Sequence, residues 1–314
     1  MAVMTITKGH LKYQLKSLEK LPIRIWEDST EASAHVAKSI ALAIRQKQQE
    51  GERLVLGLAT GSSPIGVYKE LVRMHREENL SFSNVITFNL DEYYPMEKSN
   101  VQSYDYFMRE HLFDHIDILA KNINIPNGTV ANEDLYQSCV DYEMKIKAAG
   151  GIDFQLLGIG RTGHIGFNEP GSHLNSGTRN IKLDHITRVD ASSAFLGLEN
   201  VPVKAITMGI GTVRTAKRIV LLGWGSNKAK ILKKTIEGDV SSSVPATYLQ
   251  NHHNIQNFIK SNSWFCLEYA IIRKYCFIYA YFELYPFLHK YVILSPSEMH
   301  DFSLHDLHTF DIPP

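Results

Sequence analysis

Short apolar runs alternate with helical stretches along this 314-residue chain, and this alternation constrains its fold more than any other feature. Helical spacing of apolar side chains marks 31–51, which stops at Gly51, and 65–78. The apolar runs read as strands at 53–59, 84–90, 153–159 and 218–224. Strands separated by helices build βαβ units, so we expect an α/β fold with an open, mainly parallel, Rossmann-like sheet and helices on both faces.

Composition excludes several classes of function. Lys and Arg number 33 and Asp and Glu also 33, so no global charge attracts nucleic acid or an acidic membrane. Three cysteines without a CxxC pair favour a reducing compartment. The first twenty residues lack the continuous apolar core of a signal peptide. We therefore expect a cytoplasmic protein that binds neither nucleic acid nor membranes.

The composition changes after about Asn254. The segment 264–294 is rich in aromatic residues, and no glycine follows Gly238. A membrane span is one interpretation, but charged residues such as Glu268 and Arg273 interrupt every run of about 18 apolar residues. We expect instead a tail or docking segment outside the regular alternation.

Open parallel sheets bind ligands at the carboxyl ends of their strands, and three segments bring reactive groups there. The first contains Thr60, Gly61, Ser62 and Ser63, between a predicted strand and a helix. Free amides at the helix start, hydroxyl groups and a close backbone approach at Gly61 would form a phosphate cradle. A serine that merely caps the helix explains the loop equally well. The Walker pattern GxxxxGK[ST] is absent.

The second segment carries two adjacent carboxylates, Asp91 and Glu92, directly after an apolar run. One could point into the crevice for proton transfer and the other towards a structural partner. The neighbouring Tyr93 and Tyr94 would remove water and bring a carboxylate pKa closer to working pH. The alternative is a solvated acidic loop before Pro95.

The third segment, GIGRTGHIGFNEPGS (158–172), admits two interpretations. Its glycines spell GxGxxG behind an apolar run, and Asp184 follows about twenty residues later, as in a dinucleotide-binding fingerprint. However, Gly166, Pro170 and Gly171 would break the helix which that fingerprint requires. The fingerprint also normally opens the first βαβ unit, whereas two predicted strands precede this one.

A catalytic loop explains the third segment better. His164 lies among glycines that let a substrate approach, and Glu169 follows five residues later, within reach of a turn. An imidazole oriented by a carboxylate is a common general acid/base pair. A structural histidine is the alternative. The asparagine and glutamate in the same glycine-rich loop favour catalysis.

These residues carry a resemblance. The motifs GLATGSSP, FNLDEYY, GIGRTGHIGFNEPGS, AITMGIGT and GSNKAKIL follow the order and spacing of the glucosamine-6-phosphate deaminase/isomerase family, from about Leu21 to His253. The resemblance implies three parts: an N-terminal extension at 1–20, a deaminase-like domain at 21–254, and an atypical aromatic-rich tail at 255–314.

The resemblance also implies a reaction. The family opens the pyranose ring of glucosamine 6-phosphate, moves a proton from carbon 2 to carbon 1, and releases ammonia to give fructose 6-phosphate, with no cofactor and no metal. Asp91 matches the family's enolisation base, His164 the ring-opening acid/base and Glu169 its supporting carboxylate. Thr60–Ser63 and Lys228 match the phosphate site. Relatives form homo-oligomers, so we expect one here.

The chain also departs from the family pattern. Many members carry an aspartate where this chain has Thr162, and a hydroxyl relays a hydrogen bond but holds no charge. An arginine that binds phosphate in other members aligns near Ser192 and Ser193, so that contact is missing. Two alternatives therefore stay open: a 6-phosphogluconolactonase-like hydrolase on the same fold, and a non-catalytic sugar-phosphate sensor.

Overall fold

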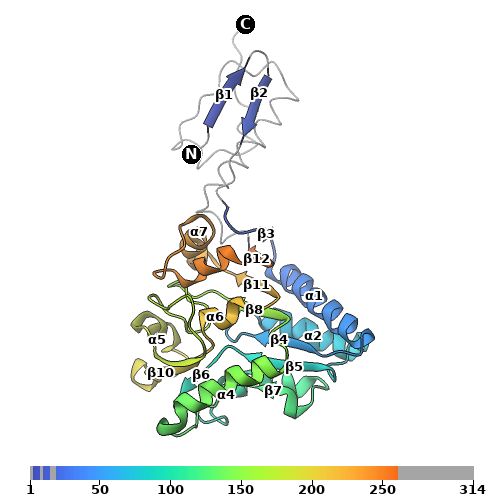
Figure 1. Ribbon diagram of the computed structural model, residues 1–314, viewed down its shortest axis with the longest axis vertical. Coiled ribbons are helices and arrows are strands. Elements are labelled where there is room, and N and C mark those ends of the chain that lie inside the picture. Colours follow the sequence, from blue (N-terminus) through green and yellow to red (C-terminus); the bar gives the residue numbers. More distant parts are fainter. Residues whose placement is uncertain (1–2, 8–9, 15–18, 261–314) are drawn as a thin grey trace. The chain divides into compact units, whose positions relative to one another are not determined.

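A seven-stranded parallel sheet forms the centre of the computed structural model, which describes residues 3–7, 10–14 and 19–260 (Figure 1). The strand order is β3-β12-β11-β8-β4-β5-β7, and each neighbouring pair is parallel. The strands are β3 Ile23–Trp26, β4 Leu54–Leu58, β5 Val85–Asn89, β7 Ile123–Asn124, β8 Phe154–Gly158, β11 Arg218–Gly223 and β12 Ile255–Lys260. The predicted parallel sheet is thus confirmed, with β4, β5, β8 and β11 on the four predicted runs.

Helices cover both faces of this sheet, as the alternation predicts. The helices are α1 Ser29–Gln49, α2 Ile65–Glu78, α3 Tyr104–His111, α4 Leu135–Ala148, α5 His185–Ala191, α6 Ile210–Arg214 and α7 Ala229–Glu237. Leu54, Leu56 and Leu58 pack with α1, α2 and α3 in one core, whereas Val55 points to the other core with α4, α6 and α7. Side chains alternate between the faces of a strand, so a strand buried on both sides is apolar throughout.

Short 3₁₀ segments join these elements: Phe113–His115, Ala120–Asn122, Asn132–Asp134, Leu198–Asn200, Ser226–Lys228 and Pro245–Asn251.

A second, three-stranded antiparallel sheet lies outside the predicted pattern. Its order is β6-β10-β9, with β6 at Asp91–Tyr94, β10 at Lys204–Thr207 and β9 at Arg179–Lys182. The segment that the sequence suggested was a loop after β5 is therefore a strand, in which Asp91 lies opposite Thr207. By itself, the N-terminal part forms an antiparallel pair, β1 Val3–Thr7 with β2 His10–Gln14.

Strand β12 begins directly after the predicted domain boundary at residue 254. It lies between β3 and β11 in the sheet, and Phe258 and Ile259 are fully buried. The sheet therefore extends six residues past that boundary, and the three-part division stays a prediction. The aromatic segment after 260 lies outside the described residues. Among the described helices, none is long and apolar enough to cross a membrane.

Candidate active site

The predicted loops meet around one cavity of about 650 Å³ at the carboxyl edge of the parallel sheet. They follow β4, β5, β8 and β11, whose carboxyl ends lie at the same edge. Seven of the eight predicted site residues line the cavity: Thr60, Gly61, Ser62, Ser63, Asp91, His164 and Lys228. Two other cavities of about 590 and 630 Å³, beside Met96 and Glu143, contain none of them.

The Thr60–Ser63 loop turns from β4 into α2 with Gly61 at φ +88°, a backbone angle that favours glycine. The residue at the N-cap of α2 is Pro64, and no side chain makes a capping hydrogen bond there. The serine-cap interpretation is therefore wrong, and Thr60, Ser62 and Ser63 all line the cavity. The Trp224 indole N–H donates to the Ser63 carbonyl at 2.9 Å, which anchors the loop.

Asp91 and Glu92 are both buried, with exposed fractions of 5% and 2%, so the solvated-loop alternative is wrong. The Glu92 carboxylate accepts hydrogen bonds from the backbone N–H groups of Tyr93, Tyr104 and Asp105, at the start of α3. Burial outweighs these bonds and raises the pKa of Glu92 to about 7. Glu92 is thus the carboxylate with a structural partner.

Asp91 is the carboxylate that faces the cavity. Burial, and secondly the charge of Glu92, raise the pKa of Asp91 well above its usual range. No Lys or Arg of the described part forms an ion pair with it within 4 Å. Gly166, at φ +56°, passes close by: a Cβ there would lie 3.2 Å from Asp91 Oδ2 and 3.0 Å from Thr207 Oγ1. The glycine leaves the carboxylate room for a substrate.

His164 also lines the cavity and belongs to a small hydrogen-bonded group. Its Nδ1 lies 3.1 Å from Glu169 Oε2, 3.0 Å from Thr162 Oγ1 and 3.3 Å from Thr187 Oγ1. A carboxylate only accepts hydrogen bonds, so Nδ1 carries a proton, and Nε2 is the ring nitrogen left to exchange a proton with a substrate. A Cβ at Gly160 would lie 2.0 Å from Nε2, so only glycine fits there.

Glu169 lies behind His164 and is the predicted site residue that does not line the cavity. Burial is the largest single influence on Glu169 and raises its pKa, but the contact with His164 and hydrogen bonds from Thr187 and the Asp184 backbone together outweigh it, so the pKa is lowered overall. Thr162 Oγ1 donates to Glu169 Oε2 at 3.3 Å. Thr162 therefore touches both members of the pair, so the hydroxyl can relay a hydrogen bond between them.

The dinucleotide interpretation of the same segment is wrong. The residues after β8 form turns instead of a helix, and the next helix is α5, which begins at His185. Asp184, the candidate ribose ligand, caps α5 by accepting from the Ile186 backbone N–H at 2.7 Å.

Lys228 reaches the cavity from the 3₁₀ turn before α7, and burial lowers its pKa. Several lining residues were missed from the sequence: Tyr104, Arg161, Phe167, Thr187, Asp190, Trp224 and Asn227. Tyr104 and Phe167 stack with ring centroids 5.8 Å apart and planes 15° apart, forming an apolar wall near Asp91. The position of Arg161 and Phe167 in the GIGRTGHIGFNEP motif was the available signal.

Comparison with known proteins agrees with this geometry. The profile of the family described as glucosamine-6-phosphate isomerases/6-phosphogluconolactonase matches residues 27–258. The chain is 49% identical over 243 residues to a putative glucosamine-6-phosphate deaminase-like protein of Bacteroides thetaiotaomicron, a match that covers 77% of this chain but only 37% of that protein. It is 46% identical to a glucosamine-6-phosphate deaminase of Clostridium novyi, covering 75% of this chain and 95% of that one.

Solved structures of similar proteins also belong to these two kinds of enzyme. A structure described as a monomeric glucosamine-6-phosphate deaminase is 40% identical, with a TM-score of 0.74, and the match covers 77% of this chain and 98% of that one. A 6-phosphogluconolactonase of Thermotoga maritima is 20% identical with a TM-score of 0.61, covering 77% of this chain and all of that one. The second likeness shows a shared fold only.

Proposed function

The chain belongs to the glucosamine-6-phosphate isomerase/6-phosphogluconolactonase family, and within it we propose that the chain is a glucosamine-6-phosphate deaminase. One observation carries this proposal. Asp91 is a buried carboxylate that forms no ion pair with any Lys or Arg of the described residues. It shares a cavity with His164, which pairs with Glu169, and with a hydroxyl-rich loop at a helix start. An acid/base pair, a separate base and an anion cradle are the groups needed to isomerise a sugar phosphate.

The reaction divides into steps that these groups support. His164 moves a proton between the anomeric hydroxyl and the ring oxygen, which opens the pyranose to the aldehyde. Asp91 takes the proton from carbon 2 and returns it to carbon 1. The carbon 2 nitrogen also loses a proton and the carbon 1 oxygen gains one, so that the aldehyde becomes an alcohol and the amine becomes an imine. Water then hydrolyses the imine to a ketone and releases ammonia.

The environment of each group suits its step. The raised pKa of Asp91 makes it a stronger base than an exposed aspartate, provided that it is ionised. Glu169 stays ionised and holds the His164 ring with Nδ1 protonated. Thr60–Ser63 and Lys228 offer amides, hydroxyls and an ammonium to the substrate phosphate.

We further propose a cytoplasmic location, which the absence of a CxxC pair from the sequence supports. The expected homo-oligomer stays a prediction, and one of the similar solved structures is described as monomeric.

Coupled assays of ammonia and fructose 6-phosphate on the purified full-length chain test the function. With chelator present and no nucleotide added, we expect both products in equal amounts from glucosamine 6-phosphate. Hydrolysis of 6-phosphogluconolactone without ammonia release would assign the site to a lactonase. Sugar-phosphate binding with no turnover of either substrate would assign it to a sensor.

A further inference from the structure

Three charged side chains, Arg161, Asp190 and Lys228, line the cavity and influence one another electrostatically. Arg161, from the loop before His164, forms a two-pronged ion pair with Asp190 of α5: Nε to Oδ2 is 2.9 Å and Nη2 to Oδ1 is 2.5 Å. Arg161, Asp190 and Lys228 all line the same cavity as the Thr60–Ser63 loop. The charges of both Asp190 and Arg161 act on the pKa of Lys228, so the three groups form one electrostatic cluster.

The charges of this cluster do not suit a bound dianion while Arg161 stays on Asp190. The ion pair is neutral as a unit, which leaves Lys228 as the single net positive charge of the three. Lys228 is also partly removed from water, since burial is the largest influence on its pKa and lowers it. A phosphate dianion that approached this end of the cavity would in addition meet the carboxylate of Asp190.

Arg161 is placed to change partners. Its side chain is 45% exposed and that of Asp190 is 40% exposed, so neither is locked by packing. The guanidinium presents parallel N–H groups that fit a phosphate in two-pronged fashion as well as they fit a carboxylate. A phosphate that carries two charges and lies beside Lys228 competes well for this donor with a partly exposed, singly charged aspartate.

We propose that Arg161 is the second cationic ligand of the substrate phosphate, and that Asp190 holds it at the cavity wall until the phosphate displaces the carboxylate. The proposal rests on the proposed function in taking the substrate to be a sugar phosphate. Arg161 is then a binding residue, which acts on affinity more than on the proton transfers at Asp91 and His164.

The test is calorimetric titration of the full-length protein with fructose 6-phosphate and with inorganic phosphate. Arg161→Gln should weaken binding of both by about ten- to a hundredfold, because it removes charged hydrogen bonds. Arg161→Lys should recover part of this loss, since it restores the charge without the fork. Arg45→Gln is the matched control, an exposed arginine that is also ion-paired with a glutamate, and should bind as the wild type does.

Asp190→Asn tells whether Arg161 is a phosphate ligand or whether the Arg161–Asp190 pair only holds the structure of the site. If Asp190 only stores Arg161, its removal frees the guanidinium, and phosphate should bind as tightly as in the wild type or more tightly. Equal weakening by Asp190→Asn and Arg161→Gln would overturn the proposal, as would wild-type affinity in Arg161→Gln. In the deaminase assay, Arg161→Gln should raise KM with kcat kept within a few-fold.

The titrations also separate this inference from the proposed function. Loss of phosphate affinity in Arg161→Gln, in a protein without deaminase activity, would support the ligand and reject the enzyme. Deaminase activity with an unchanged KM in Arg161→Gln would support the enzyme and reject Arg161 as a phosphate ligand.

Discussion

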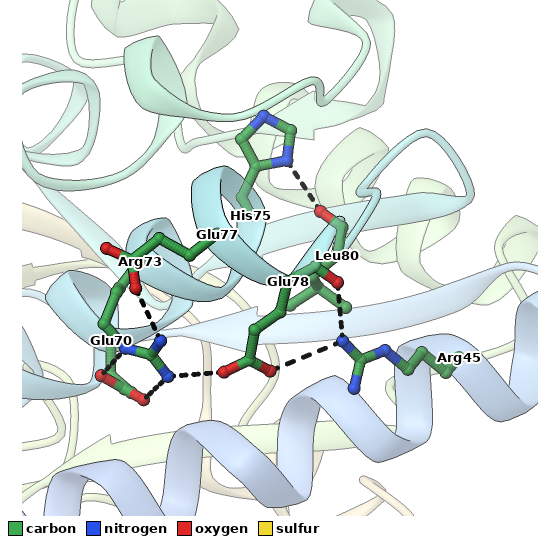
Figure 2. A network of polar contacts seen from close by, with 7 residues as sticks. All are labelled: Arg45, Glu70, Arg73, His75, Glu77, Glu78 and Leu80. Carbon is green, nitrogen blue, oxygen red and sulfur yellow. Dashed lines mark hydrogen bonds and ion pairs between the residues drawn. The ribbon is translucent and has the colours of Figure 1, made fainter.

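Two groups of carboxylates in this protein have opposite surroundings. The surface network joins α1 and α2 and consists of Arg45, Glu70, Arg73, Glu77 and Glu78 (Figure 2). Arg73 alone contacts three glutamates, at 2.7 Å from Glu70, 2.9 Å from Glu77 and 2.7 Å from Glu78. The cavity carboxylates, Asp91 and Glu92, are buried and have no ion pair with Lys or Arg within 4 Å in the described part.

The surroundings move the pKa values in opposite directions. The hydrogen bond from Arg73 lowers the pKa of Glu78, which keeps it charged. Burial raises the pKa of Asp91 and Glu92. Surface ion pairs in water contribute little to stability, whereas a carboxylate held out of water without a cation is a strong base. The same chemical group, a carboxylate, therefore stays charged in a surface ion pair in one place and is a candidate for proton transfer in the other.

Removal of the proposed base, Asp91, should give the largest effect. Asp91→Asn keeps the shape of the side chain but cannot take a proton, so deaminase turnover should fall by about a hundred- to ten-thousand-fold or more. Exchange of the carbon 2 hydrogen with solvent deuterium, followed by NMR, should be lost with it. Exchange that continued in Asp91→Asn would show that another group is the base.

Replacement of His164, the proposed ring-opening group, should lower turnover nearly as much, but only through the ring-opening step. His164→Gln should slow the closed-ring substrate by about a hundredfold. An open-chain analogue should still exchange its carbon 2 hydrogen, because Asp91 is intact. Thr162→Asp adds a charge beside the pair and should speed the closed-ring substrate alone. Equal loss on both substrate forms in His164→Gln would contradict this division of roles.

The pH dependence of kcat/KM should report the buried carboxylate. Asp91 acts only when ionised and its pKa is raised, so activity should fall as the pH drops, and this acid limb should lie well above pH 3.8. Glu92→Gln removes the neighbouring charge, which is the smaller cause of the shift. The limb should then move to lower pH but stay above the usual aspartate range, because burial, the larger cause, remains. A limb that moved to higher pH would show that the charge of Glu92 does not act on Asp91.

The surface network should give the smallest effect. Arg73→Gln should leave kcat and KM unchanged and lower the midpoint of thermal unfolding by a few degrees at most, less in high salt. The pKa of Glu78 is lowered in the folded state, so its contribution is present above its usual 4.5 and is lost as the pH falls. The difference between variant and wild type should therefore narrow below about pH 4.5. A change in KM would show that the surface network influences the active site, and the two groups of carboxylates would then not be independent.

The sequence determined the parallel sheet and the segments that carry its site. Apolar runs and helical spacing are local properties of the chain, and they placed β4, β5, β8 and β11 and, at their carboxyl ends, Asp91 and His164. The glycines next to His164 and the adjacent acids after β5 were likewise visible as patterns.

Only the tertiary structure decided which of the two adjacent acids faces the cavity and which is held by backbone N–H groups. Asp91 and Glu92 have the same chemistry in the sequence, and they differ because the start of α3 meets one and the cavity meets the other. The second sheet escaped prediction because β6, β9 and β10 are four residues each. Its pairing also joins segments far apart in the sequence, since Asp91 of β6 lies opposite Thr207 of β10. The Arg161–Asp190 pair has the same origin, since its partners are 29 positions apart and only folding brings them together.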